Sequence, residues 1–182
     1  MRRLWIFAAL VLFVFLSHRW YVVGGDDGTY IALGRSIRAG AYRAINVPGA
    51  PWQIQYPPLY PLLLAPVAHQ PAGNLGLLRL WSAAWSLLAV AGVLASARVR
   101  DQRTAFAAAA LFVASPLFGE YATSVLPEVL FVGLSYALLA RLQKTDPARR
   151  DWLLPFGLAA VCLIKSAGVA LLIAAGAWLV RH

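Results

Sequence analysis

Charged side chains and cysteine are both scarce in this 182-residue chain. Asp, Glu, Lys and Arg make up 13% of the residues, about half the share of roughly 25% that soluble globular domains carry. The single cysteine, Cys162, rules out an internal disulfide and hence a disulfide-stapled secreted scaffold. Together with a hydrophobic share of 61%, the shortage of charge favours a membrane protein over a soluble domain.

Several familiar catalytic and binding motifs are missing as well. The sequence has no glycine-rich phosphate loop, no paired-cysteine metal motif and no Gly-x-Ser-x-Gly nucleophile elbow. The three histidines, His18, His69 and His182, lack metal-ligand spacing, which argues against a preformed zinc site. The net charge of +9 is not arranged as a basic stripe or an RNA-binding motif, so we expect no nucleic-acid partner.

Long apolar runs are what the sequence does contain. Six of them can be marked, at 4–23, 75–97, 104–118, 125–140, 152–164 and 167–180. The last four are shorter than the roughly 20 residues that cross a bilayer perpendicularly, a length that suits a protein that thins the bilayer or lines a wet cavity. Residues 152–180 could form one long tilted helix, but Lys165-Ser166 near the middle favours two short helices. The predicted fold is an all-α polytopic transmembrane bundle of about six spans.

The distribution of charge gives a predicted orientation. Most of the sixteen Lys and Arg residues lie in short clusters between apolar runs, as they do in cytoplasmic loops. This rule places both termini in the cytoplasm, and Asp26, Asp27, Glu120 and Glu128 on the opposite side. We therefore predict a multi-pass integral protein of the bacterial inner (plasma) membrane, with its active site on the non-cytoplasmic side.

Residues 24–74 form the predicted outer loop, which contains two amphipathic helices. The first covers 26–39, where an Asp can cap the helix and Gly40 can stop it. Tyr30, Leu33 and Ile37 share one face, so this helix is expected to lie along the membrane surface. The second helix is predicted at 59–67, after the Pro-Pro step at 57–58.

Asp26 and Asp27 are adjacent carboxylates at the point where the first apolar run ends. One Asp is enough to cap a helix and to complement its dipole. Carboxylates at the edge of a hydrophobic segment are also costly unless they have a partner or a role. The pair is therefore either a helix cap with an extra charge, or a general base or metal ligand that faces a cavity.

Lys165, Arg79 and Glu128 are charged residues at or near the ends of apolar runs. A lysine within such a run costs about 2.5–3.5 kcal/mol on insertion scales unless it snorkels to the surface or meets an anion such as phosphate. Arg79 allows the same two interpretations, because a guanidinium can bind phosphate through two hydrogen bonds. Glu128 either complements a helix dipole or pairs with Lys165 or Arg79. Tyr56 either stacks on a sugar ring or belongs to an interfacial aromatic belt.

Four short motifs follow one another along the chain. They are Gly-Asp-Asp-Gly-Thr-Tyr at 25–30, Tyr-Pro-Pro-Leu-Tyr-Pro at 56–61, Pro-Glu-Val-Leu-Phe at 127–131 and Leu-Ile-Lys-Ser-Ala-Gly at 163–168. In this order they resemble the N-terminal module of the GT-C membrane glycosyltransferases, and most closely the protein O-mannosyltransferase and lipid A aminoarabinose transferase group. In the same order, the corresponding features of the family are a first-loop acidic motif, a Tyr-Pro-Pro-Gly-Tyr-Pro segment, the acidic start of the fourth span and a Thr-Lys-x-x-Gly turn.

The resemblance implies a function for the chain as a single membrane domain, 1–182. It implies transfer of a sugar from a polyprenyl-phosphate donor to an acceptor hydroxyl on the outer side of the membrane, with the lipid bilayer and a glycan, lipid or protein acceptor as partners. Asp26 matches the catalytic aspartate that deprotonates the acceptor, and Lys165 matches the residue that contacts the donor phosphate. The expected site residues are Asp26 and Asp27 for catalysis, and Lys165, Arg79, Glu128, Tyr56 and Tyr30 for substrate binding.

The chain departs from the family pattern in three places. Asp27 stands where Glu is usual, and residues 53–55, Gln-Ile-Gln, stand where some relatives have a metal-binding acid. No cofactor is therefore assigned, although the pattern leaves room for a divalent metal. The family also continues through further spans, so the chain is expected to lack its C-terminal part. The alternatives are a non-catalytic membrane subunit or scaffold, a truncated family member, or a transporter fragment in which Lys165 and Glu128 form an ion pair.

Overall fold

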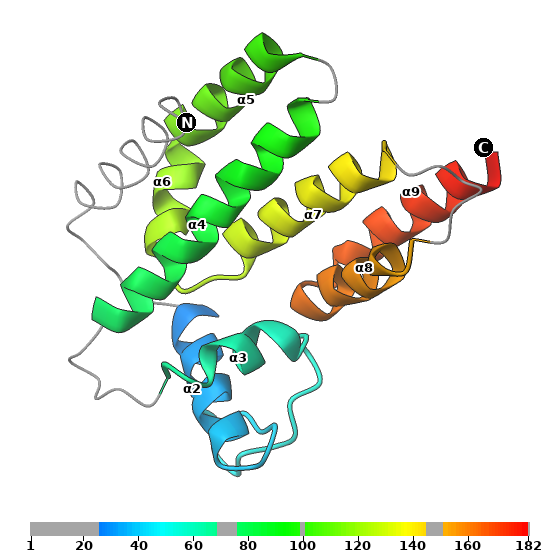
Figure 1. Cartoon of the computed structure of the whole chain (residues 1–182). Coiled ribbons are helices and arrows are strands. Elements are labelled where there is room, and N and C mark those ends of the chain that lie inside the picture. The colour runs from blue at the N-terminus through cyan, green and yellow to red at the C-terminus, as the bar shows by residue number, and fades with distance from the viewer. Residues whose placement is uncertain (1–25, 69–75, 99–100, 145–150, 182) are drawn as a thin grey trace.

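The computed structural model describes residues 26–68, 76–98, 101–144 and 151–181, without the side chains of Arg79 and Arg181. All regular elements in these ranges are helical (Figure 1). The helices are α2 (Asp26–Arg38), α3 (Leu59–Leu64), α4 (Gly76–Ala97), α5 (Gln102–Ala114), α6 (Pro116–Thr123), α7 (Glu128–Leu142), α8 (Leu153–Ile164) and α9 (Gly168–Arg181). The predicted all-α class is therefore confirmed for this part of the chain.

Helices α4 and α7 form the central pair of the fold. Helices α5 and α6 pack on one side of this pair, and α8 and α9 lie on the other side, against α7 (Figure 1). The α4–α7 packing is close because Gly92 and Gly133 face each other's helix: a Cβ at Gly92 would lie 2.3 Å from the Gly133 carbonyl oxygen. Ser82 Oγ also donates a hydrogen bond of 2.9 Å to the Ser124 carbonyl just before α7.

Helices α2 and α3 pack together at the end of the bundle where α7 begins and α8 ends (Figure 1). The helix predicted at 26–39 is confirmed as α2, and Gly40 ends it with a φ of +80°, which glycine adopts without strain. The second predicted helix is shorter than expected, because α3 ends at Leu64. The apolar face of α2 does not lie on a membrane surface: Tyr30 and Leu33 are buried inside the protein.

The prediction of a six-span bundle is wrong. Among the residues described, only α4 is long and apolar enough to cross a membrane, and α5 with α6 would count as a second span only as a pair bent by 68°. Helices α7, α8 and α9 have 15, 12 and 14 residues, which corresponds to about 18–23 Å at 1.5 Å per residue, against a hydrocarbon core of about 30 Å. The first predicted span, 4–23, lies outside the described residues.

The predicted multi-pass location is contradicted by the same finding. Several apolar runs that resembled spans pack against each other as a protein core: Ala105, Ala109 and Val113 of α5 are buried against Val90 and Val93 of α4. A short apolar run looks the same in a sequence whether protein or lipid covers it. The orientation derived from the charge clusters assumed six crossings, so it no longer holds.

The junction between the last two helices confirms the interpretation of Lys165-Ser166 as a turn. Helix α8 ends at Ile164, and α9 begins at Gly168. A Cβ at Gly168 would lie 2.7 Å from the Val161 carbonyl oxygen, closer than side-chain atoms approach backbone. Gly168 therefore lets the first turn of α9 pack directly on the last turn of α8.

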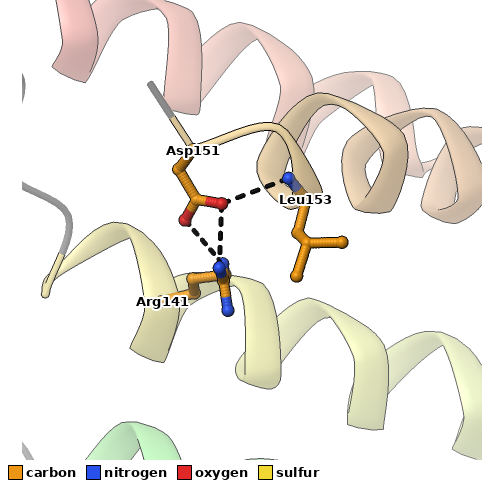
Figure 2. Close-up of polar contacts among 3 residues, drawn as sticks. All are labelled: Arg141, Asp151 and Leu153. Atoms are coloured by element: carbon orange, nitrogen blue, oxygen red, sulfur yellow. Dashed lines mark hydrogen bonds and ion pairs between the residues drawn. The ribbon is translucent and has the colours of Figure 1, made fainter. Parts of the chain in front are cut away.

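An ion pair joins the end of α7 to the start of α8. Arg141 donates to Asp151 through Nε (2.5 Å to Oδ2) and Nη2 (2.9 Å to Oδ1), and Asp151 Oδ1 also accepts the Leu153 backbone N–H (Figure 2). Arg141 is well exposed, with 46% of its side-chain surface accessible. The pair is therefore open to screening by salt.

We expect Asp151→Asn to lower the melting temperature slightly at low ionic strength. Asn retains one oxygen that can accept the Leu153 N–H, and the substitution removes the charge and the hydrogen bond from Arg141 Nε to the second oxygen. Because the pair is exposed, the loss should shrink as salt is added. Thermal unfolding of wild type and variant at low salt and in molar NaCl checks this, and an equal loss at both salt concentrations would contradict it.

Candidate active site

Lys165 and Glu128 form an ion pair across two helix ends. Lys165 Nζ donates a hydrogen bond of 2.7 Å to Glu128 Oε1, although the residues are 37 positions apart. Glu128 is the first residue of α7, and Lys165 follows the last residue of α8 with an extended backbone. The Glu128 side chain is 25% accessible, and the Lys165 side chain is 36% accessible. Of the interpretations open for Glu128, the structure places it as a partner of Lys165.

Asp27 is buried beside this ion pair. It is 3% exposed and accepts a hydrogen bond from the Val125 backbone N–H, and its Oδ1 atom has no hydrogen-bond partner in the described part of the chain. Burial, the negative charge of Glu128 and, to a smaller extent, the negative charge of Asp26 together raise the pKa of Asp27 to about 6. The hydrogen bond from the Val125 N–H acts in the opposite direction and lowers this pKa. Asp27 is therefore a carboxyl group that titrates close to neutral pH.

Asp26, by contrast, is exposed. Its Oδ1 atom accepts a hydrogen bond of 2.5 Å from the Tyr56 hydroxyl, and this bond raises the pKa of Tyr56. Tyr42 in turn donates a hydrogen bond of 2.7 Å to the Tyr56 carbonyl oxygen. These contacts attach the loop that carries the Tyr-Pro-Pro segment to the start of α2, and they leave the Asp26 carboxylate open to solvent.

Aromatic rings fill the space between the charged groups. The Tyr30 ring meets the rings of Tyr56 and Tyr60 edge-on, with 5.1 Å between ring centres in both pairs. Burial and the nearby charges of Glu128 and Asp26 raise the pKa of Tyr30, which keeps its hydroxyl neutral. Tyr30 thus lies within the electrostatic reach of both acids and connects the two halves of the site.

Six of the seven residues expected at the site are gathered there by α2, the following loop, α7 and the α8–α9 turn: Asp26, Asp27, Tyr30, Tyr56, Glu128 and Lys165. The seventh, Arg79, lies in the first turn of α4, and its side chain is outside the described part of the structure. Glu120 lies on α6, is exposed, and contributes its backbone carbonyl to Ser124. Trp52 stacks under the Arg43 guanidinium, 4.3 Å from the ring centre.

Two contributors to the site were not found from the sequence. Val125 acts through its backbone N–H, a group that every non-proline residue carries, so no side-chain signal could reveal it. Tyr42 supports the backbone of Tyr56 across 14 positions. Its aromatic ring in a polar, turn-rich loop was the one available signal.

An apolar groove lies close to the charged groups. It encloses about 540 Å³ between the end of α2, α3 and the end of α8. Its lining is Ile37, Gly40, Ala41, Tyr42, Pro58, Leu59, Leu62 and Leu163. Tyr42 connects the groove to Tyr56 through its hydrogen bond, and the apolar lining suits a hydrocarbon chain.

No metal ligand is assigned. In ranges 26–68, 76–98, 101–144 and 151–181, no three His, Cys, Asp or Glu side chains are grouped so that they could hold a metal ion. Asp27 and Glu128 are two carboxylates, and one of them is already engaged with Lys165. The chemistry considered below therefore uses the side chains alone.

The raised pKa of Asp27 predicts how the stability of the protein changes with pH. The folded state holds the Asp27 proton with a pKa of about 6, against the ordinary pKa of 3.8 for an Asp side chain. This stabilisation is complete below pH 3.8 and is lost as the pH rises through 6, a total of about 3 kcal/mol at 1.36 kcal/mol per pKa unit. Asp27→Asn should lack this dependence, so its stability relative to wild type should increase between pH 4 and pH 7.

Chemical denaturation of both proteins at several pH values in this range measures the effect. Free energies of unfolding that run parallel for wild type and Asp27→Asn would contradict the assignment. A wild-type curve that falls more steeply than that of the variant would support it.

Comparison with protein-family models, with curated proteins and with solved structures finds no match to this chain. The function of the chain must therefore be inferred from the geometry of the site.

Proposed function

We propose that this chain is a glycosyltransferase that moves a sugar from a polyprenyl-phosphate donor to an acceptor hydroxyl. The observation that carries the proposal is the gathering of an exposed carboxylate, Asp26, and a partly exposed ammonium, Lys165, around the buried Asp27 and the half-buried Glu128. A base and a cation at one site are what displacement of a phosphate by a hydroxyl requires.

Lys165 would act on the phosphate end of the donor. Negative charge grows on the phosphate oxygen as the sugar leaves, and a fixed ammonium stabilises that charge in the transition state. Glu128 holds Lys165 Nζ at 2.7 Å, which orients it before the donor binds. The 36% accessibility of the Lys165 side chain leaves room for a second, anionic partner.

Asp26 would act on the acceptor as the general base. The acceptor hydroxyl attacks the anomeric carbon, the bond from that carbon to the phosphate oxygen breaks, and the hydroxyl proton passes to the Asp26 carboxylate. A single displacement of this kind inverts the configuration at the anomeric carbon. Tyr56 donates its hydroxyl to one Asp26 oxygen, which leaves the second oxygen for the acceptor.

The apolar groove beside α3 would hold the first units of the prenyl chain. Its lining is apolar except for Tyr42, which donates a hydrogen bond to the Tyr56 carbonyl oxygen of the site. Large apolar residues are also exposed on α8 and α9, among them Phe156 (72%) and Ile173 (67%). Exposed apolar surface of this kind supports contact with a lipid bilayer, where a polyprenyl phosphate resides.

One observation favours a second candidate, a non-catalytic subunit or scaffold. Glu128 already neutralises Lys165, so an anion must compete with a carboxylate for the ammonium. A subunit that keeps the ion pair only for its structure would show the same contact. Binding of a polyprenyl phosphate without any sugar transfer would favour this candidate.

The proposal is tested by offering the purified chain a panel of radiolabelled polyprenyl-phosphate sugars together with glycan, lipid and peptide acceptors. We expect the label to move to an acceptor from at least one lipid-linked donor, and not from nucleotide-linked sugars. The donor without an acceptor serves as the blank for hydrolysis. A folded protein that transfers no sugar from any lipid-linked donor would overturn the proposal.

A further inference from the structure

The acid pair beside Lys165 contains two oxygen atoms that the proposed transfer does not use. Asp27 Oδ1 and Glu128 Oε2 are both buried, and neither has a hydrogen-bond partner in the described part of the chain. Buried polar atoms of folded proteins nearly always find a partner. Two such oxygens on neighbouring carboxyl groups therefore call for an explanation.

Among the described side chains, one positive charge lies within hydrogen-bond distance of the two carboxyl groups. This charge is Lys165, which engages Glu128 Oε1. Asp27 receives the neutral Val125 N–H, and Glu128 is the charge that raises its pKa most. Two ionised carboxylates facing one ammonium leave one buried negative charge uncompensated, a state that proteins avoid.

The other titratable groups that face the pair do not supply the missing charge. Asp26 is a further acid on α2, and it adds to the repulsion felt by Asp27. Tyr30 and Tyr56 both have raised pKa values, so their hydroxyl groups stay neutral over the physiological range. Among the described residues, the remaining way to balance the two carboxyl groups is a proton on Asp27.

We propose that Asp27 takes up a proton beside Glu128, and that uptake of this proton strengthens the binding of an anion at Lys165. With the proton, the two carboxyl groups and Lys165 have no net charge. Without it, they have a net charge of −1 and repel an incoming anion. Asp27 is thus a positioning residue: it acts on the anion through the charge of Glu128, and Glu128 acts through its contact with Lys165.

This inference rests on the proposed function in one respect, the identity of the natural anion, which would be the donor phosphate. Its physical content is a linkage between anion binding and proton binding, and the two must favour each other reciprocally. If one proton is taken up per anion, the affinity for the anion falls by up to tenfold for each pH unit above the pKa of Asp27.

Isothermal titration calorimetry with inorganic sulfate tests the linkage, because sulfate keeps the same charge between pH 5 and pH 8. Titrations at pH 7 in two buffers with different ionisation enthalpies report the number of protons taken up. We expect wild type to take up between half a proton and one proton per sulfate, and its affinity to weaken three- to tenfold from pH 6.5 to pH 7.5. Lys165→Gln should remove the binding, which locates the sulfate.

Asp27→Asn is the decisive variant, because it keeps the size of the side chain and cannot titrate. We expect it to bind sulfate without proton uptake and with the same affinity at both pH values. Glu128→Gln, which removes the negative charge that adds to the rise in the pKa of Asp27, should reduce the uptake. Circular dichroism and thermal unfolding establish that each variant is folded.

Three results would overturn the proposal: no sulfate binding to wild type at either pH, sulfate binding to wild type without proton uptake, or undiminished uptake in Asp27→Asn. The outcome is independent of sugar transfer. If sulfate binding is proton-linked but no lipid-linked sugar is used, the proposed function fails and this inference stands. If transfer occurs and sulfate binding is not proton-linked, the reverse is true.

Discussion

Replacing Asp26 with Asn is expected to lower the rate of sugar transfer by about 10²–10⁴-fold, the range that a positioned general base contributes. The Asn side chain keeps an oxygen that can accept the Tyr56 hydroxyl, so the contact between α2 and the following loop should persist. It cannot take the proton of the acceptor. The loss should therefore appear in turnover and not in folding.

Initial rates with the donor identified from the panel measure this effect. Glu120→Gln is the matched control, because Glu120 is an exposed acid on α6 that is not part of the site, and its rate should equal that of wild type. Tyr56→Phe removes the hydroxyl that orients Asp26 and should give a smaller loss than Asp26→Asn. Full activity in Asp26→Asn would remove Asp26 from the mechanism.

Gly133→Ala is expected to destabilise the fold by about 3 kcal/mol, at the upper end of the usual range for overpacking. A Cβ at Gly133 would lie 2.6 Å from Ala89 Cα and 2.8 Å from Ala89 N. These are backbone atoms of α4, so no side chain can rotate to make room. The two central helices would have to move apart.

Gly176→Ala is the matched control for this substitution. Gly176 also lies within a helix, α9, and a Cβ there would meet no atom within 4 Å. Because Ala has a better helix propensity than Gly, the control should stabilise the protein by about 0.5–1 kcal/mol. Chemical denaturation compares the two variants, and similar stabilities would contradict the close packing of α4 on α7.

The helices could be predicted where local signals mark their ends. Gly40 ends α2 with a positive φ, and the polar Lys165-Ser166 step separates α8 from α9. The break between α5 and α6 was missed although Pro116 gave a signal for it. Pro116 is the first residue of α6, the position in a helix where proline is best tolerated, and the apolar residues on both sides concealed the break.

The number of spans could not be predicted, because hydropathy does not record what covers an apolar face. The buried face of α5 packs on α4, and the apolar face of α2 packs inside the protein, with Tyr30 against Tyr60. Both faces have the composition of a membrane segment. What each face packs against, known only from the structure, distinguishes the two cases.

The candidate site could be predicted from the sequence only through charged residues that are unusual in an apolar context. Asp27, Glu128 and Lys165 stood out because a charge in an apolar context needs a partner. Which partner each residue takes depends on how α2, α7 and α8 meet, and sequence spacing does not contain that information. Glu128 lies in the first turn of α7, as the helix-dipole interpretation predicts, and the 2.7 Å contact shows that it also pairs with Lys165.

Zero-length cross-linking with a carbodiimide tests most directly whether these distant residues meet at one site. The reagent converts a carboxylate and an amine in contact into an amide, and the chain has two lysines, Lys144 and Lys165, so peptide mass spectrometry can assign the link. We expect an amide between Lys165 and Glu128, and none in Lys165→Arg, which keeps the charge but forms no such bond. A folded protein in which Lys165 links to Asp101 or Glu120 instead, or to no carboxylate at all, would contradict the site described here.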